Sequence, residues 1–149
     1  MKIIEANVTD ISDMNEVIVA AKKHWGYSQD QLALWLPDLL VNENTLKERQ
    51  FWLLVDNSAI IGVSSVSQQT EEEYELEDCW VLPSQIGTGA GKHLFAHVVN
   101  WLQNRNAKNL TIVSDPSARG FYEHMGAELI RMKPSVPKGR VIPVLNLAL

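Results

Sequence analysis

Cysteine is nearly absent from this chain, and its scarcity removes two classes of small protein. Cys79 is the only cysteine among 149 residues, so neither an internal disulfide nor a cysteine-rich metal site can form. A reducing, cytoplasmic setting is the simplest interpretation of this cysteine usage. The four histidines show no metal-ligand spacing with acidic residues, so we expect no metal cofactor.

Long hydrophobic runs and excess positive charge are also missing. No apolar segment approaches the roughly 20 residues that a membrane-spanning helix needs. Glu5 interrupts the N-terminus too early for a signal peptide. The net charge is −5 and the pI about 5.3, which disfavours a nucleic-acid binder held by phosphate contacts. We therefore expect neither a membrane nor a nucleic acid as partner.

Internal repeats and low-complexity linkers are lacking as well, so a single domain over residues 1–149 is expected. Hydrophobic residues make up 46% of the chain and charged residues 21%, a globular composition. Such a length suffices for one substantial core.

Hydrophobic periodicity predicts two helices in the first third of the chain. The first begins after Asp10, a candidate N-cap, and has apolar residues at a period close to 3.6. Ser28 and Gln31 form a capping box that opens the second helix over residues 29–40. Pro37 lies inside that helix and is expected to kink or shorten it.

The remaining pattern predicts one central sheet of mixed α/β type. Expected strands cover residues 2–6, 51–55, 59–67, 73–82, 109–113, 127–132 and 140–147. Expected helices cover residues 88–104 and 115–125, the second closed by Gly126. The order β-α-α-β-β-β-α-β-α-β-β describes a single α/β domain.

The most informative segment is a glycine-rich turn between a strand and a helix. The strand ends near Pro83, three glycines alternate at Gly87, Gly89 and Gly91, and Lys92 follows at the start of the helix. Backbone N–H groups at a helix N-terminus bind anions, and glycines let a phosphate approach the backbone. The turn therefore predicts a phosphate site, although a connection without a ligand is the plain structural alternative.

Two common phosphate motifs do not match this turn. A P-loop would need glycine at Ile86 and serine or threonine at His93. A dinucleotide fingerprint would need its third glycine at Lys92. A nucleotide-binding domain is therefore disfavoured.

Two linked motifs resemble the GNAT superfamily of acetyl-CoA-dependent N-acetyltransferases. The first is Val81-x-Pro83 followed by the three glycines and Leu94. The second is Asp115-x-x-Ala118-x-x-Phe121-Tyr122-x-x-x-Gly126-Ala127. The resemblance implies a single-domain GNAT-like fold, with a mixed, mostly antiparallel sheet flanked by about four helices. It also implies acetyl-CoA as co-substrate.

The family pattern implies roles for individual residues of this chain. The backbone of Cys79, Trp80 and Val81 would pair with the pantetheine arm. Asp115 would lie beside that arm, where most members have asparagine, and Tyr122 beside the sulfur. The pyrophosphate would be held by the whole turn, namely Gly87, Thr88, Gly89, Ala90, Gly91 and Lys92.

Acetyl transfer to an amine needs a group that protonates the departing thiolate and a group that takes the amine's proton. Tyr122 is the candidate acid. The base is sought among the six acids of residues 71–78. Strict strand alternation gives a face of odd-numbered residues, namely Glu75, Glu77, Cys79 and Val81. The other face holds Tyr74, Leu76, Asp78 and Trp80. Glu77 is the candidate base, acting directly or through water; a solvated hairpin end is the alternative for the acidic run.

The acceptor is an amine that the sequence does not identify, expected to be on a small molecule. Trp25 and Tyr27 are the candidate acceptor-binding residues, because the resemblance puts their segment beside the acceptor site. A non-catalytic acyl-CoA-binding or regulatory module on the same fold is the alternative function. The sequence leaves a homodimer open.

Overall fold

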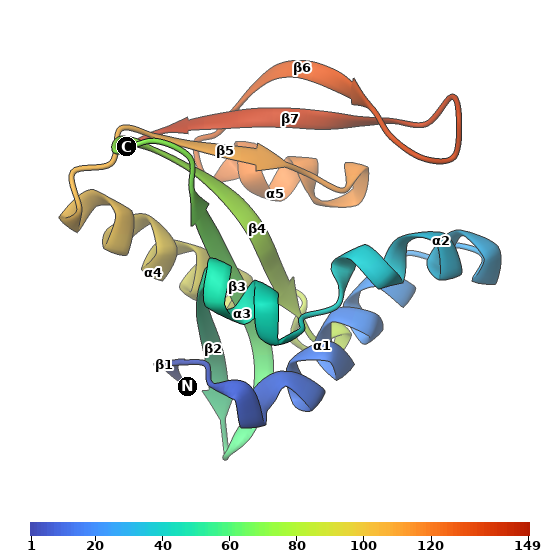
Figure 1. Cartoon of the computed structure of the whole chain (residues 1–149), viewed down its shortest axis with the longest axis horizontal. Coiled ribbons are helices and arrows are strands. Elements are labelled where there is room, and N and C mark those ends of the chain that lie inside the picture. The colour runs from blue at the N-terminus through green and yellow to red at the C-terminus, as the bar shows by residue number, and fades with distance from the viewer. The chain divides into compact units, whose positions relative to one another are not determined.

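A computed structural model describes all 149 residues and contains one seven-stranded sheet. The strand order is β1-β2-β3-β4-β5-β7-β6 (Figure 1). The strands are β1 (Lys2–Glu5), β2 (Gln50–Asp56), β3 (Ala59–Gln68), β4 (Glu73–Val81), β5 (Asn109–Val113), β6 (Glu128–Pro134) and β7 (Val141–Ala148). β4 and β5 are parallel, whereas β1–β2, β2–β3, β5–β7 and β6–β7 are antiparallel. The expected α/β class and the mixed, mostly antiparallel sheet are confirmed.

Five α-helices accompany the sheet, one more than the sequence predicts. They are α1 (Ile11–Lys23), α2 (Gln29–Leu39), α3 (Glu43–Glu48), α4 (Ala90–Asn104) and α5 (Arg119–His124). None of them is both long and apolar enough to cross a lipid bilayer. Short 3₁₀ turns cover Val8–Asp10, Pro83–Gln85 and Pro116–Ala118.

The chain divides into two compact units that share β3, β4 and α4. The first unit comprises Met1–Val66 and Asp78–Val98, and the second comprises Ser67–Glu77 and Val99–Leu149. The expectation of one domain over the whole chain stays a prediction.

In the first unit, neighbouring residues of β2 serve two different cores because side chains alternate along a strand. Leu53 packs with residues of α1, including Met14 and Ile18. Leu54 packs instead with Ala90 and Leu94 of α4. The two helices therefore cover opposite faces of β2. The hairpin turn from β2 to β3 passes through Asn57 and Ser58, whose φ angles of 49° and 66° are left-handed.

In the second unit, β4 runs parallel to β5, with Glu73 opposite Asn109 and Leu76 opposite Ile112. β7 lies between β5 and β6, as Figure 1 shows, so β6 is the edge strand. Tyr74 packs edge to face on Trp101 of α4, with ring centroids 6.0 Å apart.

Three expectations about helix starts can be compared with the structure. The capping box of α2 is confirmed, because the Gln31 N–H donates to Ser28 Oγ and the Ser28 N–H donates to Gln31 Oε1. The expectation that Asp10 caps α1 is wrong. Asn7 caps the preceding 3₁₀ turn, and the Asp10 carboxylate accepts from the Asn7 N–H at 2.9 Å instead. α4 begins at Ala90 rather than Thr88, because Gly87 and Gly89 adopt positive φ angles.

Candidate active site

The glycine turn leads from the end of β4 to the N-terminus of α4, within the first unit. Gly87 and Gly89 have φ angles of +80° and +88°, which other residues adopt only with strain. A Cβ added at either glycine would meet nothing within 4 Å, so open space lies over both. Backbone conformation, rather than crowding, therefore requires glycine here.

The N-terminus of α4 has the chemistry of an anion site. The first N–H groups of a helix have no carbonyl partner within the helix and carry the positive end of its dipole. The first turn of α4 contains no acid, and Lys92 is exposed. These features fit the pyrophosphate site that the resemblance to the GNAT superfamily implies for this turn.

Cys79, Trp80 and Val81 form the half-buried last three residues of β4, directly before this turn. The adjoining strand β3 approaches them closely at Gly62. A Cβ at Gly62 would lie 3.2 Å from the Trp80 carbonyl oxygen and equally near Leu54 and Leu94. Glycine at this position therefore lets β3 pack against the segment that is predicted to bind the pantetheine arm.

The expectation that side chains alternate strictly between the two faces of β4 is wrong at Glu77 and Asp78. Ser65 and Ser67 are two residues apart on β3 and share a face. Ser67 Oγ donates to Glu77 Oε1 at 2.7 Å, and Ser65 Oγ donates to Asp78 Oδ2 at 2.5 Å. Two adjacent residues of β4 thus direct their carboxylates to one face, which requires a local irregularity in the strand.

The residues on either side of this irregularity confirm the change of face. Tyr74, before it, packs on Trp101 of α4. Trp80, after it, packs with the α1 cluster, although both residues have even numbers. Val81 packs with the cluster that contains Ala90 and Leu94 of α4. The expected odd and even faces therefore exchange between Glu77 and Asp78.

Asp78 is the residue of this region that sequence reasoning missed. It lies in an acidic run, which usually indicates a solvated surface, yet it is only 3% exposed. Its carboxylate accepts from Arg49 Nη1 at 3.2 Å, from the Trp80 indole at 3.0 Å and from Ser65. The one signal that could have found it is the pattern of large apolar residues at every second position, Tyr74, Leu76 and Trp80, in which Asp78 takes the place between the last two.

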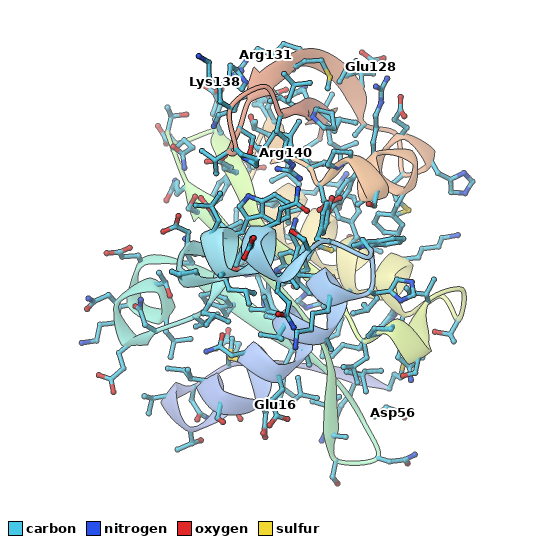
Figure 2. All side chains as sticks on the ribbon, turned by 90° about the vertical axis from the view of Figure 1, so that its right-hand side faces the viewer. Glu16, Asp56, Glu128, Arg131, Lys138 and Arg140 are labelled. Carbon is cyan, nitrogen blue, oxygen red and sulfur yellow. The ribbon has the colours of Figure 1, made fainter.

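Three further predicted residues lie in the second unit, namely Glu77, Asp115 and Tyr122. Asp115 Oδ1 accepts from the Ser117 N–H at 2.9 Å, and Oδ2 lies 4.0 Å from Arg140 Nη2. Arg140 thus partly compensates the carboxylate charge that distinguishes this chain from the usual asparagine. Figure 2 shows Arg140 below Arg131 and Lys138, the other labelled cations of the β6–β7 hairpin.

Tyr122 lies on α5 and is 6% exposed. Its ring meets Phe121 edge to face, with centroids 5.2 Å apart, and its carbonyl accepts from the Ala127 N–H. Gly126, with a φ of +102°, ends the helix as the sequence predicts. The sequence motif that contains Tyr122 and Gly126 therefore also ends α5.

The connection between α1 and α2 contains both predicted acceptor residues, and the structure gives them different surroundings. Trp25 is 44% exposed and contacts His24 edge to face. Tyr27 is half-buried and contacts the ring of Trp35 and the ammonium of Lys22. Trp25 is thus open to solvent, whereas Tyr27 belongs to a packed cluster.

A second unexpected feature of the first unit is His97, on the face of α4 that meets Trp52 with ring centroids 5.3 Å apart. Its Nδ1 is buried without a hydrogen-bond partner, as is Oγ of Ser64, which pairs with Trp52 across the strands. Burial, with a smaller contribution from the charge of His93, lowers the pKa of His97 below 6.5.

Comparison with known proteins agrees with this arrangement. Residues 14–127 match the model of the acetyltransferase (GNAT) family. The chain resembles the PaiA N-acetyltransferase from Thermoplasma acidophilum, solved in complex with coenzyme A, with a TM-score of 0.83 and 15% identity over 99% of this chain and 98% of that one. It also resembles a GNAT-family acetyltransferase from Staphylococcus aureus Mu50, with a TM-score of 0.75 and 22% identity over 99% and 98%.

A sequence relative is the uncharacterized N-acetyltransferase ycf52 of Gracilaria tenuistipitata var. liui, 28% identical over 67 residues. That match covers 45% of this chain and only 37% of the relative. The family match extends over most of the chain, so this protein belongs to the acetyltransferase (GNAT) family. The resemblance drawn from the two sequence motifs is confirmed, and so is the expected enzyme class at the level of the acetyltransferase (GNAT) family.

Proposed function

We propose that this chain transfers an acetyl group from acetyl-CoA directly to an amine of an acceptor, which we take to be a small molecule. The observation that carries the proposal is the N-terminus of α4. It is opened by two left-handed glycines and follows directly on the end of β4, in a chain of the GNAT family.

The cofactor contacts that we propose use mainly backbone groups. Cys79, Trp80 and Val81 would pair with the pantetheine arm, and the turn from Gly87 to Lys92 would hold the pyrophosphate. Asp115, with Arg140 beside it, would contact the arm as an acceptor of hydrogen bonds.

Acetyl-CoA supplies an activated acetyl thioester, and the protein must then manage two protons. An alkylamine has a pKa of about 10.4 and must lose a proton before it can attack. Glu77 is proposed as the base, acting directly or through water. Tyr122 is proposed to protonate the departing thiolate, which needs a neutral phenol at the working pH.

Binding of acetyl-CoA tests the site without knowledge of the acceptor. At 100 times its dissociation constant, a ligand raises the free energy of unfolding by about 2.7 kcal/mol. Gly89→Glu should abolish this shift, because the side chain strains the turn and repels the pyrophosphate. Gly139→Glu is the matched control, since Gly139 also has a positive φ and open space around it, at +94°, but lies in the β6–β7 hairpin. Equal shifts in both variants would contradict the site.

An acceptor screen with acetyl-CoA, read as release of free thiol, tests catalysis. Thiol release that depends on an added amine supports the enzyme. Binding of acetyl-CoA with no thiol release across polyamines, aminoglycosides, amino acids and peptides would favour the non-catalytic acyl-CoA-binding module.

A further inference from the structure

Asp78 is a buried carboxylate surrounded by donors from three segments of the first unit. Arg49 follows α3 and precedes β2, Ser65 lies on β3, and Trp80 lies two residues further along β4. Arg49 and Ser65 both donate to Oδ2, and the Trp80 indole donates to Oδ1. Burial of a carboxylate costs free energy unless such groups compensate it, so this cluster is a specific arrangement and not a solvated acid.

Asp78 lies directly before the segment of β4 that is proposed to bind the pantetheine arm. It is the first residue after the point at which the strand loses its alternation, and Cys79–Val81 follow it directly. The Leu82 N–H donates to the Ile61 carbonyl at 2.9 Å, so β3 also holds the chain directly after this segment. The direction of each peptide group in Cys79–Val81 depends on where the irregularity lies.

The side chain of Trp80 connects the cluster to the core. The ring packs with the cluster of residues that includes Met14 and Ile18 of α1, while its indole N–H is held by Asp78. The Asp78 carboxylate thus holds the indole ring of Trp80 in place, and with it this part of β4.

We propose that Asp78, compensated by Arg49, is a positioning residue for acetyl-CoA: it fixes the irregularity of β4 so that the peptide groups of Cys79–Val81 are aligned with the pantetheine arm. This inference rests on the proposed function. Asp78 itself touches neither substrate and takes no proton in the reaction.

The first test is Asp78→Asn, which keeps the size of the side chain but removes the negative charge that faces the Arg49 guanidinium. A misalignment of about 1 Å can reduce a rate by ~10²-fold, so we expect kcat/KM for acetyl-CoA to fall roughly 10- to 100-fold. KM for acetyl-CoA should rise, and KM for the acceptor should stay within about twofold. Glu73→Gln, an exposed acid on the same strand, is the matched control and should behave like the wild type.

A second variant separates alignment from folding. Arg49→Gln combined with Asp78→Asn replaces the ion pair by two neutral amides that can still hydrogen-bond each other, so the double variant should recover part of the acetyl-CoA affinity lost in Asp78→Asn. If Asp78→Asn does not fold, Ser65→Ala and Trp80→Phe each remove one donor and leave the charges paired. Both should raise KM for acetyl-CoA more than KM for the acceptor.

The inference is overturned if these variants lower the melting temperature while both KM values stay at the wild-type level, or if both KM values rise equally. Failure of the proposed function looks different, because the wild type and Glu73→Gln would then show neither acetyl-CoA binding nor thiol release.

Discussion

The ammonium of Lys22 lies over the ring of Trp35, 4.7 Å from its centroid, and 4.9 Å from the ring centroid of Tyr27. The two rings meet edge to face at 4.7 Å, and Lys22 is 5% exposed. A buried lysine is uncommon unless its charge is compensated, and aromatic faces supply part of that compensation. The end of α1, the following connection and α2 are therefore held together by one cluster, which leaves Trp25 exposed beside it.

This difference predicts separate effects for the two proposed acceptor residues. Trp25→Ala should raise KM for the acceptor about 10-fold, as expected when apolar contact worth about 1–3 kcal/mol is lost, and should leave the melting temperature nearly unchanged. Tyr27→Leu should also lower the free energy of unfolding, because it removes a ring from the Lys22 cluster. Equal effects of Trp25→Ala on both KM values would instead assign Trp25 a packing role.

Tyr122→Phe should keep acetyl-CoA binding and reduce kcat. A general acid contributes about 10²–10⁴-fold, so the loss should lie in that range if Tyr122 protonates the thiolate. Tyr74→Phe is the matched control, because Tyr74 is a similarly buried tyrosine that packs on Trp101. Full turnover in Tyr122→Phe would mean that water or another group supplies the proton.

Glu77→Gln should reduce kcat/KM at neutral pH and weaken the low-pH limb of the pH–rate profile, since glutamine does not titrate. Glu77 Oε1 accepts from Ser67 Oγ, which in turn accepts from Gln69 Nε2, and both bonds can persist in the variant. Attraction of a cationic acceptor by the carboxylate would fade with salt, because exposed charges are screened beyond ~10 Å at 0.1 M. The effect of losing a base would not fade with salt.

The measurement is therefore the pH–rate profile of Glu77→Gln at low and at high salt. Glu73→Gln controls for the general effect of removing one acid from this strand. A profile identical to that of the wild type at both salt concentrations would remove Glu77 from the mechanism.

His97 predicts a pH dependence of stability. Its pKa in the folded protein is lowered from 6.5, so below pH 6.5 the unfolded chain binds a proton more readily than the folded protein does. The free energy of unfolding should therefore be highest above pH 6.5 and fall as the pH drops through that value towards the folded pKa. His97→Gln should flatten this part of the curve in denaturant titrations, and His124→Gln, which changes an exposed histidine, should not.

Local patterns predicted most of the elements, because they depend on residues close in sequence. The capping box of Ser28 and Gln31 and the helix end at Gly126 both follow from neighbours within a few positions. α3 was missed because six residues show no apolar periodicity. Its cap at Asn42, which accepts from the Thr45 N–H at 3.0 Å, was the signal that could have found it.

The irregularity of β4 could not be predicted in the same way. It depends on Ser65, Ser67 and Arg49, which are distant in sequence and look like ordinary polar residues. An alternation rule assumes a regular strand, so it put Asp78 on the wrong face relative to Glu77. The assignments of Glu77, Asp115 and Tyr122 came from family motifs, and their roles stay predictions.

The turn between β2 and β3 shows where this sequence could still be improved. Asn57 and Ser58 both adopt left-handed backbone angles, as two-residue hairpin turns of this type require. The left-handed conformation costs asparagine little conformational energy, costs serine more, and is unstrained for glycine. The hairpin tip is thus Asn-Ser, where Asn-Gly would fit the same backbone angles with less strain. Replacing the serine of this tip by glycine is therefore a starting point for a more heat-resistant version of the protein.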